Sequence, residues 1–213
     1  MERDAILFLH GFASSAHSSK ARYLGERFAA LPGVRFDALD FNPTPADFEH
    51  MTITGMIDRL RQFALDHEMH SARIIGSSLG ALVALHYARR YAGVDRLLLL
   101  APALRYGLQV SDDELRRWER EGAIRVPHHA FDAELPLGYG YHLDGLRYAQ
   151  PVPPPAEITI VHGTADSIVP IQGSRSYAAA HPGMVRLVEV ASDHRLEDQL
   201  DAIWGQVESF LLS

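Results

Sequence analysis

The sequence predicts an α/β fold, in which a mainly parallel sheet of about six strands carries helices on both faces. Short apolar runs, such as residues 5–9, alternate along the chain with longer segments whose apolar residues recur at helical spacing. These runs are apolar at nearly every position, which is typical of parallel strands covered on both faces. Because strands that alternate with helices build parallel βαβ units, both observations favour a layered α/β domain.

Length and composition limit the class of protein. The chain has 213 residues, 47% of them hydrophobic, which fits one domain with room for a small insertion. A formal net charge of -7 argues against nucleic acid or an anionic membrane as the partner. The absence of cysteine excludes disulfides and a cysteine nucleophile. Residues 1–9 lack a secretory signal pattern, and no apolar run approaches the ~20 residues of a membrane helix, so we expect a cytoplasmic protein without a membrane span.

The first half of the chain follows the alternation closely. Pro32 and Gly33 end the first helix. Pro43 and Pro45 predict a loop over residues 40–45, because proline disfavours helix at the residue before it. In chain order we expect strand 5–9, helix 18–31, strand 34–39, helix 54–67, strand 73–76, helix 78–91 and strand 96–100.

The alternation breaks between residues 104 and 155. Ser111 and Glu114 have the spacing of a capping box, which predicts a helix that runs to Glu121. Scattered aromatic residues and glycines follow, and a proline-rich stretch at 151–155 leads back to the regular pattern. Such a long excursion in a compact domain is typically a lid or a binding loop, so we expect 104–155 to be a small cap over the site. The alternative is a surface-covering helix with a loose tail.

The alternation resumes after residue 155. Pro182 and Gly183 stop the next expected helix. No internal repeat is visible, so we expect residues 1–213 to form a single domain. The elements expected here are strand 158–161, helix 172–180, strand 185–190 and a closing helix over 196–212.

The pentapeptide G-x-S-x-G at residues 76–80 lies where a short strand turns sharply into a helix, with Ser78 at its centre. This pattern is typical of a nucleophile elbow, in which the serine hydroxyl stands clear of a strained turn. Gly76 and Gly80 avoid the clash that a Cβ would cause where the helix doubles back over the strand. The alternative is a serine that merely N-caps an ordinary helix.

Two more reactive side chains follow the ends of predicted strands. Asp166 comes after strand 158–161 and His194 after strand 185–190. Ligands of open parallel sheets bind outside the carboxyl ends of the strands, so these side chains and Ser78 are expected at one edge. The chain order Ser, Asp, His matches a triad in which His194 is the base and Asp166 orients it.

A serine nucleophile also needs donors for the oxyanion that forms on the attacked carbonyl. The backbone N–H groups of Leu79, directly after Ser78, and of Phe12, in the first strand-to-helix loop, are the expected donors. Each such donor typically contributes about 3 kcal/mol to lowering the barrier.

Other acidic residues and histidines of the sequence are candidates for a place in the site. Asp40 ends a strand and is the alternative acid, whereas Asp193 adjoins His194 but neighbours on an extended loop rarely face each other. His10 and His162 precede glycines at strand ends and are expected to brace loops. His67 and His70, at the end of a predicted helix, lack the further ligands that a metal needs, and the pair at 128–129 is expected in a solvated loop, so we expect no metal.

The substrate-binding residues are the least determined part of the site. The aromatic residues Tyr106, Trp118 and Tyr139 of the expected cap either line an acyl pocket or pack the cap itself. Ile168, in the loop that carries Asp166, is a further candidate for substrate contact.

The stretches 7–12, 75–80, 162–166 and 193–194 together resemble the α/β-hydrolase superfamily, and residues 10–21 with 76–80 resemble its YqiA-like group of small bacterial esterases. The resemblance implies a three-layer α/β sandwich and carboxylester hydrolysis by a Ser-Asp-His triad, without metal or cofactor. Two residues depart from it: Ala81 stands where many relatives have glycine, and Arg195 where a small residue is common.

The sequence therefore predicts a serine hydrolase that cleaves a small-molecule carboxylic ester or thioester through an acyl-serine intermediate. Amide or peptide cleavage and acyl transfer on the same triad are alternatives, as is a hydrolase-like binding module without chemistry. The small size of the expected cap suggests short or medium acyl chains.

Overall fold

A computed structural model describes residues 4–107 and 110–213, so the first three residues of the expected signal-free N-terminus lie outside the described chain. Its centre is a six-stranded sheet in which every neighbouring pair is parallel, in the order β2-β1-β3-β4-β7-β8. This confirms the predicted parallel sheet of six strands. The strands are β1 (Asp4–Leu9), β2 (Val34–Leu39), β3 (Ala72–Ser77), β4 (Val94–Leu100), β7 (Glu157–Gly163) and β8 (Val185–Val190).

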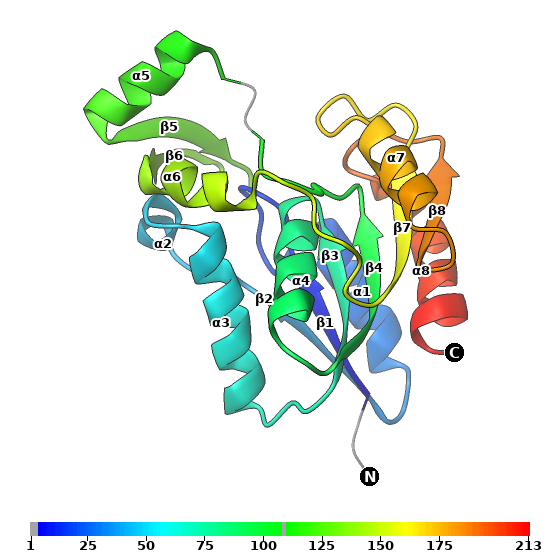
Figure 1. Cartoon of the computed structure of the whole chain (residues 1–213). Coiled ribbons are helices and arrows are strands. Elements are labelled where there is room, and N and C mark those ends of the chain that lie inside the picture. The colour runs from blue at the N-terminus through cyan, green and yellow to red at the C-terminus, as the bar shows by residue number, and fades with distance from the viewer. Residues whose placement is uncertain (1–3, 108–109) are drawn as a thin grey trace.

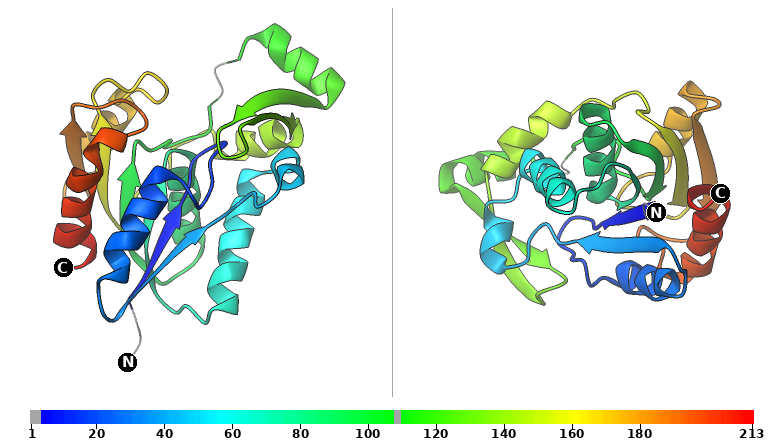
Figure 2. Two further views of the ribbon diagram at one scale, coloured as in Figure 1. Left: turned by 180° about the vertical axis from the view of Figure 1, so that it is seen from behind. Right: turned by 90° about the horizontal axis from the view of Figure 1, so that it is seen from below.

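Helices cover both faces of this sheet (Figures 1 and 2). Alternate side chains of each strand pack against opposite layers, because successive residues of a strand point to opposite faces. One layer holds α1 (Ser19–Ala29) and α8 (Leu200–Gln206); the other holds α3 (Ile53–Asp66), α4 (Leu79–Arg90) and α7 (Gln172–Ala180). In β1, Phe8 packs with α1 and α8, whereas Leu7 and Leu9 pack with α3 and α4.

The C-terminal helix differs from its prediction. In place of one helix over 196–212, a 3₁₀ turn η2 (Glu197–Gln199) leads into α8, and a π-helical turn η3 (Val207–Leu211) follows. Leu196 has a φ of 54°, so a right-handed helix cannot begin there. At the other end, Arg73 and Arg96 donate to the carbonyls of Leu211 and Phe210, which draws the last turn onto the sheet.

We call residues 104–155, which connect β4 to β7, the inserted segment; residues 108–109 within it are not described. The capping box of Ser111 and Glu114 is present at the start of α5, as predicted. The residues after α5, where the sequence showed only scattered aromatic residues and glycines, form an antiparallel hairpin, so the alternative of a loose tail does not hold there. The segment holds α5 (Asp112–Glu121), β5 (Ala123–His128), β6 (Ala133–Gly138), α6 (Gly140–Gly145) and a 3₁₀ turn η1 (Leu146–Tyr148).

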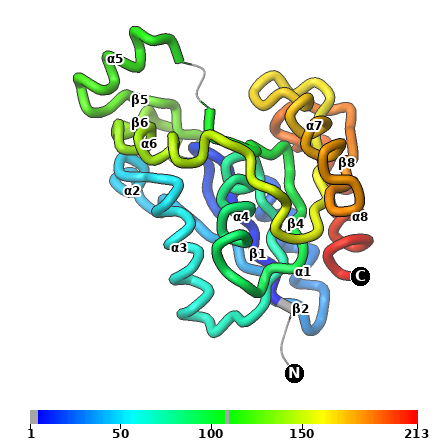
Figure 3. Tube along the Cα trace, in the orientation of Figure 1, coloured from blue at the N-terminus to red at the C-terminus, as the bar shows by residue number. Residues whose placement is uncertain are grey.

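The inserted segment lies over the ends of α2 (Pro45–Glu49) and α3, as Figures 1 and 3 show. Helix α2 was not expected after the predicted loop at 40–45. A capping box between Thr44 and Asp47, with Pro45 in the first helical turn, starts it. Asp144 of α6 accepts hydrogen bonds from the backbone N–H (2.8 Å) and the hydroxyl (2.5 Å) of Thr54 in α3. These bonds tie the segment to the core.

Within residues 4–107 and 110–213, no helix is both long and apolar enough to cross a lipid bilayer.

Candidate active site

The turn between β3 and α4 has the geometry of a strained elbow. Ser78 adopts a φ of 52° and a ψ of -114°, a region that costs a residue with a side chain about 1–3 kcal/mol. A Cβ on Gly76 would lie 2.7 Å from the Cα of Ala81, and one on Gly80 would lie 2.7 Å from the carbonyl oxygen of His10. Only glycine fits at these positions. The Ser78 side chain makes no capping bond to α4, which removes the helix-cap alternative.

The three predicted reactive side chains form one hydrogen-bonded chain. The Oγ of Ser78 lies 3.0 Å from Nε2 of His194, and Nδ1 of His194 lies 2.7 Å from Oδ2 of Asp166. An ionised carboxylate only accepts, so Nδ1 carries the imidazole proton and Nε2 accepts from the serine hydroxyl. The side chain of His194 is 20% exposed and that of Asp166 fully buried, so the chain runs from the surface inward.

The loop after β7 holds the Asp166 carboxylate from its other side. Oδ1 accepts the backbone N–H groups of Ile168 at 2.9 Å and Val169 at 2.8 Å. Oδ2 is left to face His194. This loop geometry fixes the direction in which the carboxylate meets the imidazole.

The loop that carries His194 is packed against the end of β7. A Cβ on Gly163 would collide with the carbonyl oxygen of Ser192, so glycine allows this close approach. The N–H of Ala165 donates to that same carbonyl at 3.0 Å. From α1, the ammonium of Lys20 donates to the carbonyl oxygen of Arg195 at 2.6 Å. The backbone on both sides of His194 is thereby held, at Ser192 by the loop after β7 and at Arg195 by α1.

The first strand-to-helix loop lies directly against Ser78. A Cβ on Gly11 would approach the Ser78 Cβ to 3.3 Å, which places the following N–H of Phe12 beside the serine. The N–H of Leu79 is the first of α4, and the first four N–H groups of a helix have no intrahelical acceptor. The two residues expected to supply the oxyanion donors thus directly follow Gly11 and Ser78, and their role stays a prediction.

His10 braces this loop. Its Nδ1 lies 2.8 Å from the carbonyl oxygen of Gly11, and its Nε2 accepts the N–H of Phe41 at 3.0 Å. Asp40, the alternative acid, lies 3.5 Å from the same ring and makes no contact with His194. Burial would raise the pKa of Asp40, but the neighbouring His10 ring and hydrogen bonds from the backbone N–H groups of Asn42 and Ala16 outweigh it and lower the pKa to about 2.

The expected substrate-binding residues lie in different surroundings. Trp118 is buried within the inserted segment and donates from Nε1 to the carbonyl of Leu137 at 2.8 Å, and Tyr139 packs on it edge to face. Tyr106 is also buried, with its hydroxyl 3.1 Å from Nδ1 of His142. Ile168, by contrast, is 62% exposed beside the Asp166 loop.

A cluster of three aromatic rings that the sequence did not indicate borders the loop between β1 and α1. The Phe12 ring, 36% exposed, packs against Phe48 of α2 and Tyr141 of α6, with ring centroids 5.5 and 5.7 Å apart. The three residues of this cluster are far apart in the sequence, and no local pattern marks them as neighbours. The Phe12 ring follows Gly11, which packs against Ser78, and leaves part of its apolar surface exposed.

His162 was expected only to brace a loop, but its Nε2 lies 3.1 Å from the Oδ2 of Asp166. The spacing of four residues between the two side chains was the available signal in the sequence.

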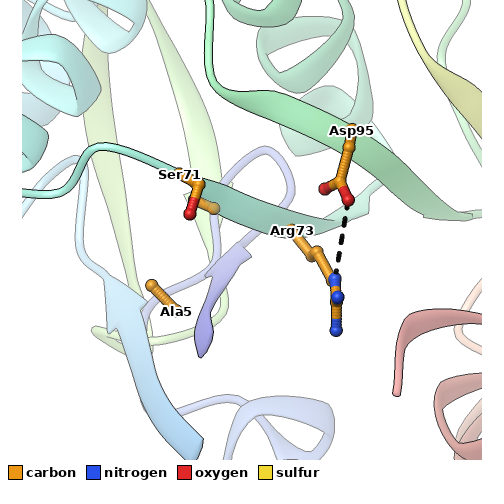
Figure 4. Close-up of a pocket in the computed structure, with 5 residues that line it drawn as sticks. Ala5, Ser71, Arg73 and Asp95 are labelled. Carbon is orange, nitrogen blue, oxygen red and sulfur yellow. Dashed lines mark ion pairs between the residues drawn. The ribbon is translucent and has the colours of Figure 1, made fainter. Parts of the chain in front are cut away.

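Other places in the molecule offer less chemistry. Among the described residues, no group of three or more histidine, aspartate or glutamate side chains is placed to hold a metal ion. A cavity of about 50 Å³ lies at the opposite, amino-terminal edge of the sheet, where Arg73 pairs with Asp95 beside Ser71 (Figure 4).

The parallel sheet, the elbow after β3 and the three loops that meet above it define the α/β-hydrolase fold. The chain belongs to the family UPF0227, described as an uncharacterised protein family, whose model matches residues 5–211. The resemblance inferred from the motifs is thereby confirmed. No curated protein sequence matches this chain significantly.

Solved structures with the same fold include three with bacterial sources. A hydrolase candidate from Agrobacterium vitis S4 superposes with a TM-score of 0.84 at 21% identity, covering 98% of this chain and 88% of that one. Est1E from Butyrivibrio proteoclasticus, with ferulic acid bound, has a TM-score of 0.76 at 17% identity and coverages of 100% and 90%. The esterase EaEST from Exiguobacterium antarcticum has a TM-score of 0.73 at 16% identity and coverages of 100% and 94%.

Proposed function

We propose that this protein is a serine hydrolase that cleaves a small-molecule carboxylic ester or thioester through an acyl-serine intermediate. The observation that carries the proposal is the unbroken hydrogen-bond chain from Ser78 through His194 to Asp166, with distances of 3.0 and 2.7 Å. A serine hydroxyl is a weak nucleophile at neutral pH and needs such a base to become reactive.

In the first half of the reaction, Nε2 of His194 takes the Ser78 proton while Oγ attacks the acyl carbon. Asp166 stabilises the imidazolium that results. The oxyanion of the tetrahedral intermediate accepts the N–H groups of Phe12 and Leu79. When the intermediate collapses, Nε2 returns the proton to the leaving oxygen or sulfur, and the acyl group stays on Ser78.

In the second half, water enters where the leaving group was. His194 takes a proton from this water as its oxygen attacks the acyl carbon, and then returns a proton to Ser78 as the carboxylic acid leaves. Water thus takes the place of Ser78 as the nucleophile, Ser78 becomes the leaving group, and no cofactor enters either half.

We also propose that the inserted segment is a small cap on a single domain. The packing of Tyr141 on the half-exposed Phe12 ring supports this, because it brings the segment to the edge of the site. The partly exposed Phe12 ring, on the residue after the glycine that packs against Ser78, favours an acyl or aromatic substrate group over a charged one. Short or medium acyl chains and a cytoplasmic location stay predictions from the sequence.

Labelling with a fluorophosphonate probe tests the proposal directly. We expect a stoichiometric adduct on the wild-type protein and none on Ser78→Ala, because the probe needs an activated serine. Ser77→Ala, next to it in the chain, is the matched control and should label like wild type. An unlabelled wild-type protein that is folded would contradict the proposal.

A substrate panel separates the reactions open to this triad. We expect p-nitrophenyl esters of two to eight carbons, or the matching thioesters, to be cleaved faster than anilides of the same acids. Preference for anilides would favour amide cleavage instead. A maximal rate with long acyl chains would contradict the predicted chain length.

A further inference from the structure

His162 lies at the end of β7 with its side chain fully buried. Three polar groups surround the ring. Its Nε2 is 3.1 Å from the Oδ2 of Asp166 and 2.9 Å from the carbonyl oxygen of Val169. Its Nδ1 is 2.8 Å from the Oγ of Ser174 in α7. Neither the proposed catalytic cycle nor the expected loop bracing accounts for the contact with the carboxylate.

These partners determine which ring nitrogen carries the proton. Both groups that face Nε2 are acceptors, the carboxylate of Asp166 and the carbonyl of Val169, so Nε2 carries hydrogen. The hydroxyl of Ser174 can donate to Nδ1. A neutral His162 with its proton on Nε2 therefore satisfies all three contacts, because this one hydrogen is shared between the carboxylate at 3.1 Å and the carbonyl at 2.9 Å, as a fully buried ring requires.

With this proton in place, the buried carboxylate of Asp166 has four donors. Oδ1 takes the N–H groups of Ile168 and Val169, and Oδ2 takes Nε2–H of His162 and Nδ1–H of His194. An ionised carboxylate has about four lone-pair sites, so this set fills them. Without His162, Oδ2 would keep one partner in a site that water does not reach.

We propose that His162 is a positioning residue for Asp166, whose Nε2–H holds Oδ2 at the point where Nδ1 of His194 meets it. The inference rests on the proposed function, since it assigns a part in the same triad. Removing this donor leaves the carboxylate free to turn about the two bonds to Oδ1, and the imidazole then loses its fixed orientation.

Two substitutions of His162 test the assignment. Gln places an amide nitrogen where Nε2 stands and can still donate to Asp166, whereas Met fills similar space without a donor. We expect His162→Met to lower kcat at least about tenfold with KM unchanged, and His162→Gln to retain most of the activity. Ser174→Ala is the matched control: it removes the partner of Nδ1 only, and we expect kcat close to wild type.

Two outcomes of these measurements would contradict the assignment. If His162→Met keeps the wild-type kcat, or if the Met and Gln variants lose activity equally while both are folded, His162 does not position the carboxylate. If the Met variant does not fold, two other results test the assignment. A proton on Nε2 of His162 in the wild type, together with retained activity of the Gln variant, supports it, and the absence of either contradicts it.

Imidazole NMR provides a readout that does not depend on turnover. In wild-type protein labelled with ¹⁵N at histidine, we expect the ring shifts of His162 to report a neutral ring protonated at Nε2. We also expect a low-field proton at Nδ1 of His194 that persists in His162→Gln and is lost in His162→Met. A His162 ring protonated at Nδ1 alone would overturn the assignment.

These results are distinguishable from a failure of the proposed function. Absence of fluorophosphonate labelling on Ser78, with the expected His162 tautomer and the expected change at His194, would reject the hydrolase and leave the positioning role intact. Labelled Ser78 with a bare Nε2 on His162 would do the opposite.

Discussion

At the scale of single residues, the elbow depends on backbone approach rather than on side-chain contacts. A Cβ at Gly80 would collide with the carbonyl of Leu9 and lie 2.7 Å from that of His10. Backbone atoms at the end of β1 cannot move aside without disturbing the loop between β1 and α1, which packs against Ser78. We therefore infer that this glycine sets the distance between the first loop and Ser78.

Gly80→Ala is expected to lower the free energy of unfolding by at least about 2 kcal/mol, because the clash is with backbone. Gly205→Ala is the matched control. Nothing lies within 4 Å of a Cβ at Gly205 in α8, so the better helix propensity of alanine should raise stability by up to about 1 kcal/mol. Urea unfolding of both variants measures this. Equal stability of the two would show that the approach at Gly80 is not tight.

Asp166→Asn tests the orientation of the imidazole. The amide oxygen can still accept the two backbone N–H groups, but its nitrogen would donate toward His194 and favour the wrong tautomer. We expect kcat for ester cleavage to fall by roughly 10⁴-fold. Asp193→Asn is the control, since Asp193 accepts from the N–H of Arg195 at 2.8 Å and does not touch the imidazole. A comparable loss in both variants would argue against Asp166 as the partner.

At the scale of elements, the bounds were predicted correctly for several segments of the central sheet and its helices. Strands 34–39 and 185–190 and helix 172–180 have the predicted bounds. The hairpin of β5 and β6 was missed because Pro127 and Pro136 lie inside its strands. Proline is tolerated there since each strand of a two-stranded ribbon has a free edge. Such an exception depends on tertiary context that composition does not reveal.

The junction between α6 and α3 is a second place where tertiary context decides. Asp144 receives both polar hydrogens of Thr54 at the start of α3, and the side chain of Thr54 also contacts Tyr148 at 2.7 Å. This carboxylate serves the N-terminal turn of a helix 90 residues away in the chain. No local sequence signal could have predicted it.

Asp144→Ala should therefore loosen the inserted segment. We expect a loss of about 2 kcal/mol in stability, since two half-buried donors lose a charged acceptor. Cleavage by a protease within 104–155 should become faster. Asp113→Ala, which removes only an exposed pair with Arg116, should change neither property. Unchanged proteolysis in Asp144→Ala would mean that other contacts hold the segment in place.

At the scale of the whole molecule, the sheet explains why the site was easier to predict than its surroundings. Parallel strands bring their carboxyl ends to one edge, so the order of strands was enough to group Ser78, Asp166 and His194. Their catalytic roles stay predictions. The aromatic surface around Phe12 depends on how the inserted segment folds back, and the sequence does not encode that packing in any short pattern.

Two histidines with lowered pKa values, the partly buried His86 and the buried His128, should make the whole fold sensitive to mild acid. Burial, aided by Arg90 and Arg89, lowers the pKa of His86 from its ordinary value near 6.5 to about 4. The unfolded chain therefore binds more protons than the folded one between these values. Stability from the neutral ring is complete above pH 6.5 and is lost as pH falls toward 4.

His86→Phe tests this dependence. The phenyl ring can keep the edge-to-face contact with Tyr148, whose ring centroid lies 4.7 Å away, and it does not titrate. We expect the free energy of unfolding to fall less steeply from pH 6.5 to 4 in the variant than in the wild type, measured by urea titration at several pH values. Some slope should remain, because burial also lowers the pKa of His128. Identical slopes in the two proteins would contradict the assignment.

The place where the inserted segment joins the core has a consequence for engineering and for divergence among relatives. It departs from β4 and returns to β7, which are adjacent strands joined in register from Arg96 with Glu157 to Leu100 with Val161. Because these strands are parallel, the segment leaves the sheet at the carboxyl end of β4 and must run back along the molecule to the amino end of β7 (Figure 1). The part from α5 to β6 lies above the carboxyl edge, so we expect it to tolerate changes of length or sequence that the returning stretch does not, and new specificities can arise there without rebuilding the scaffold.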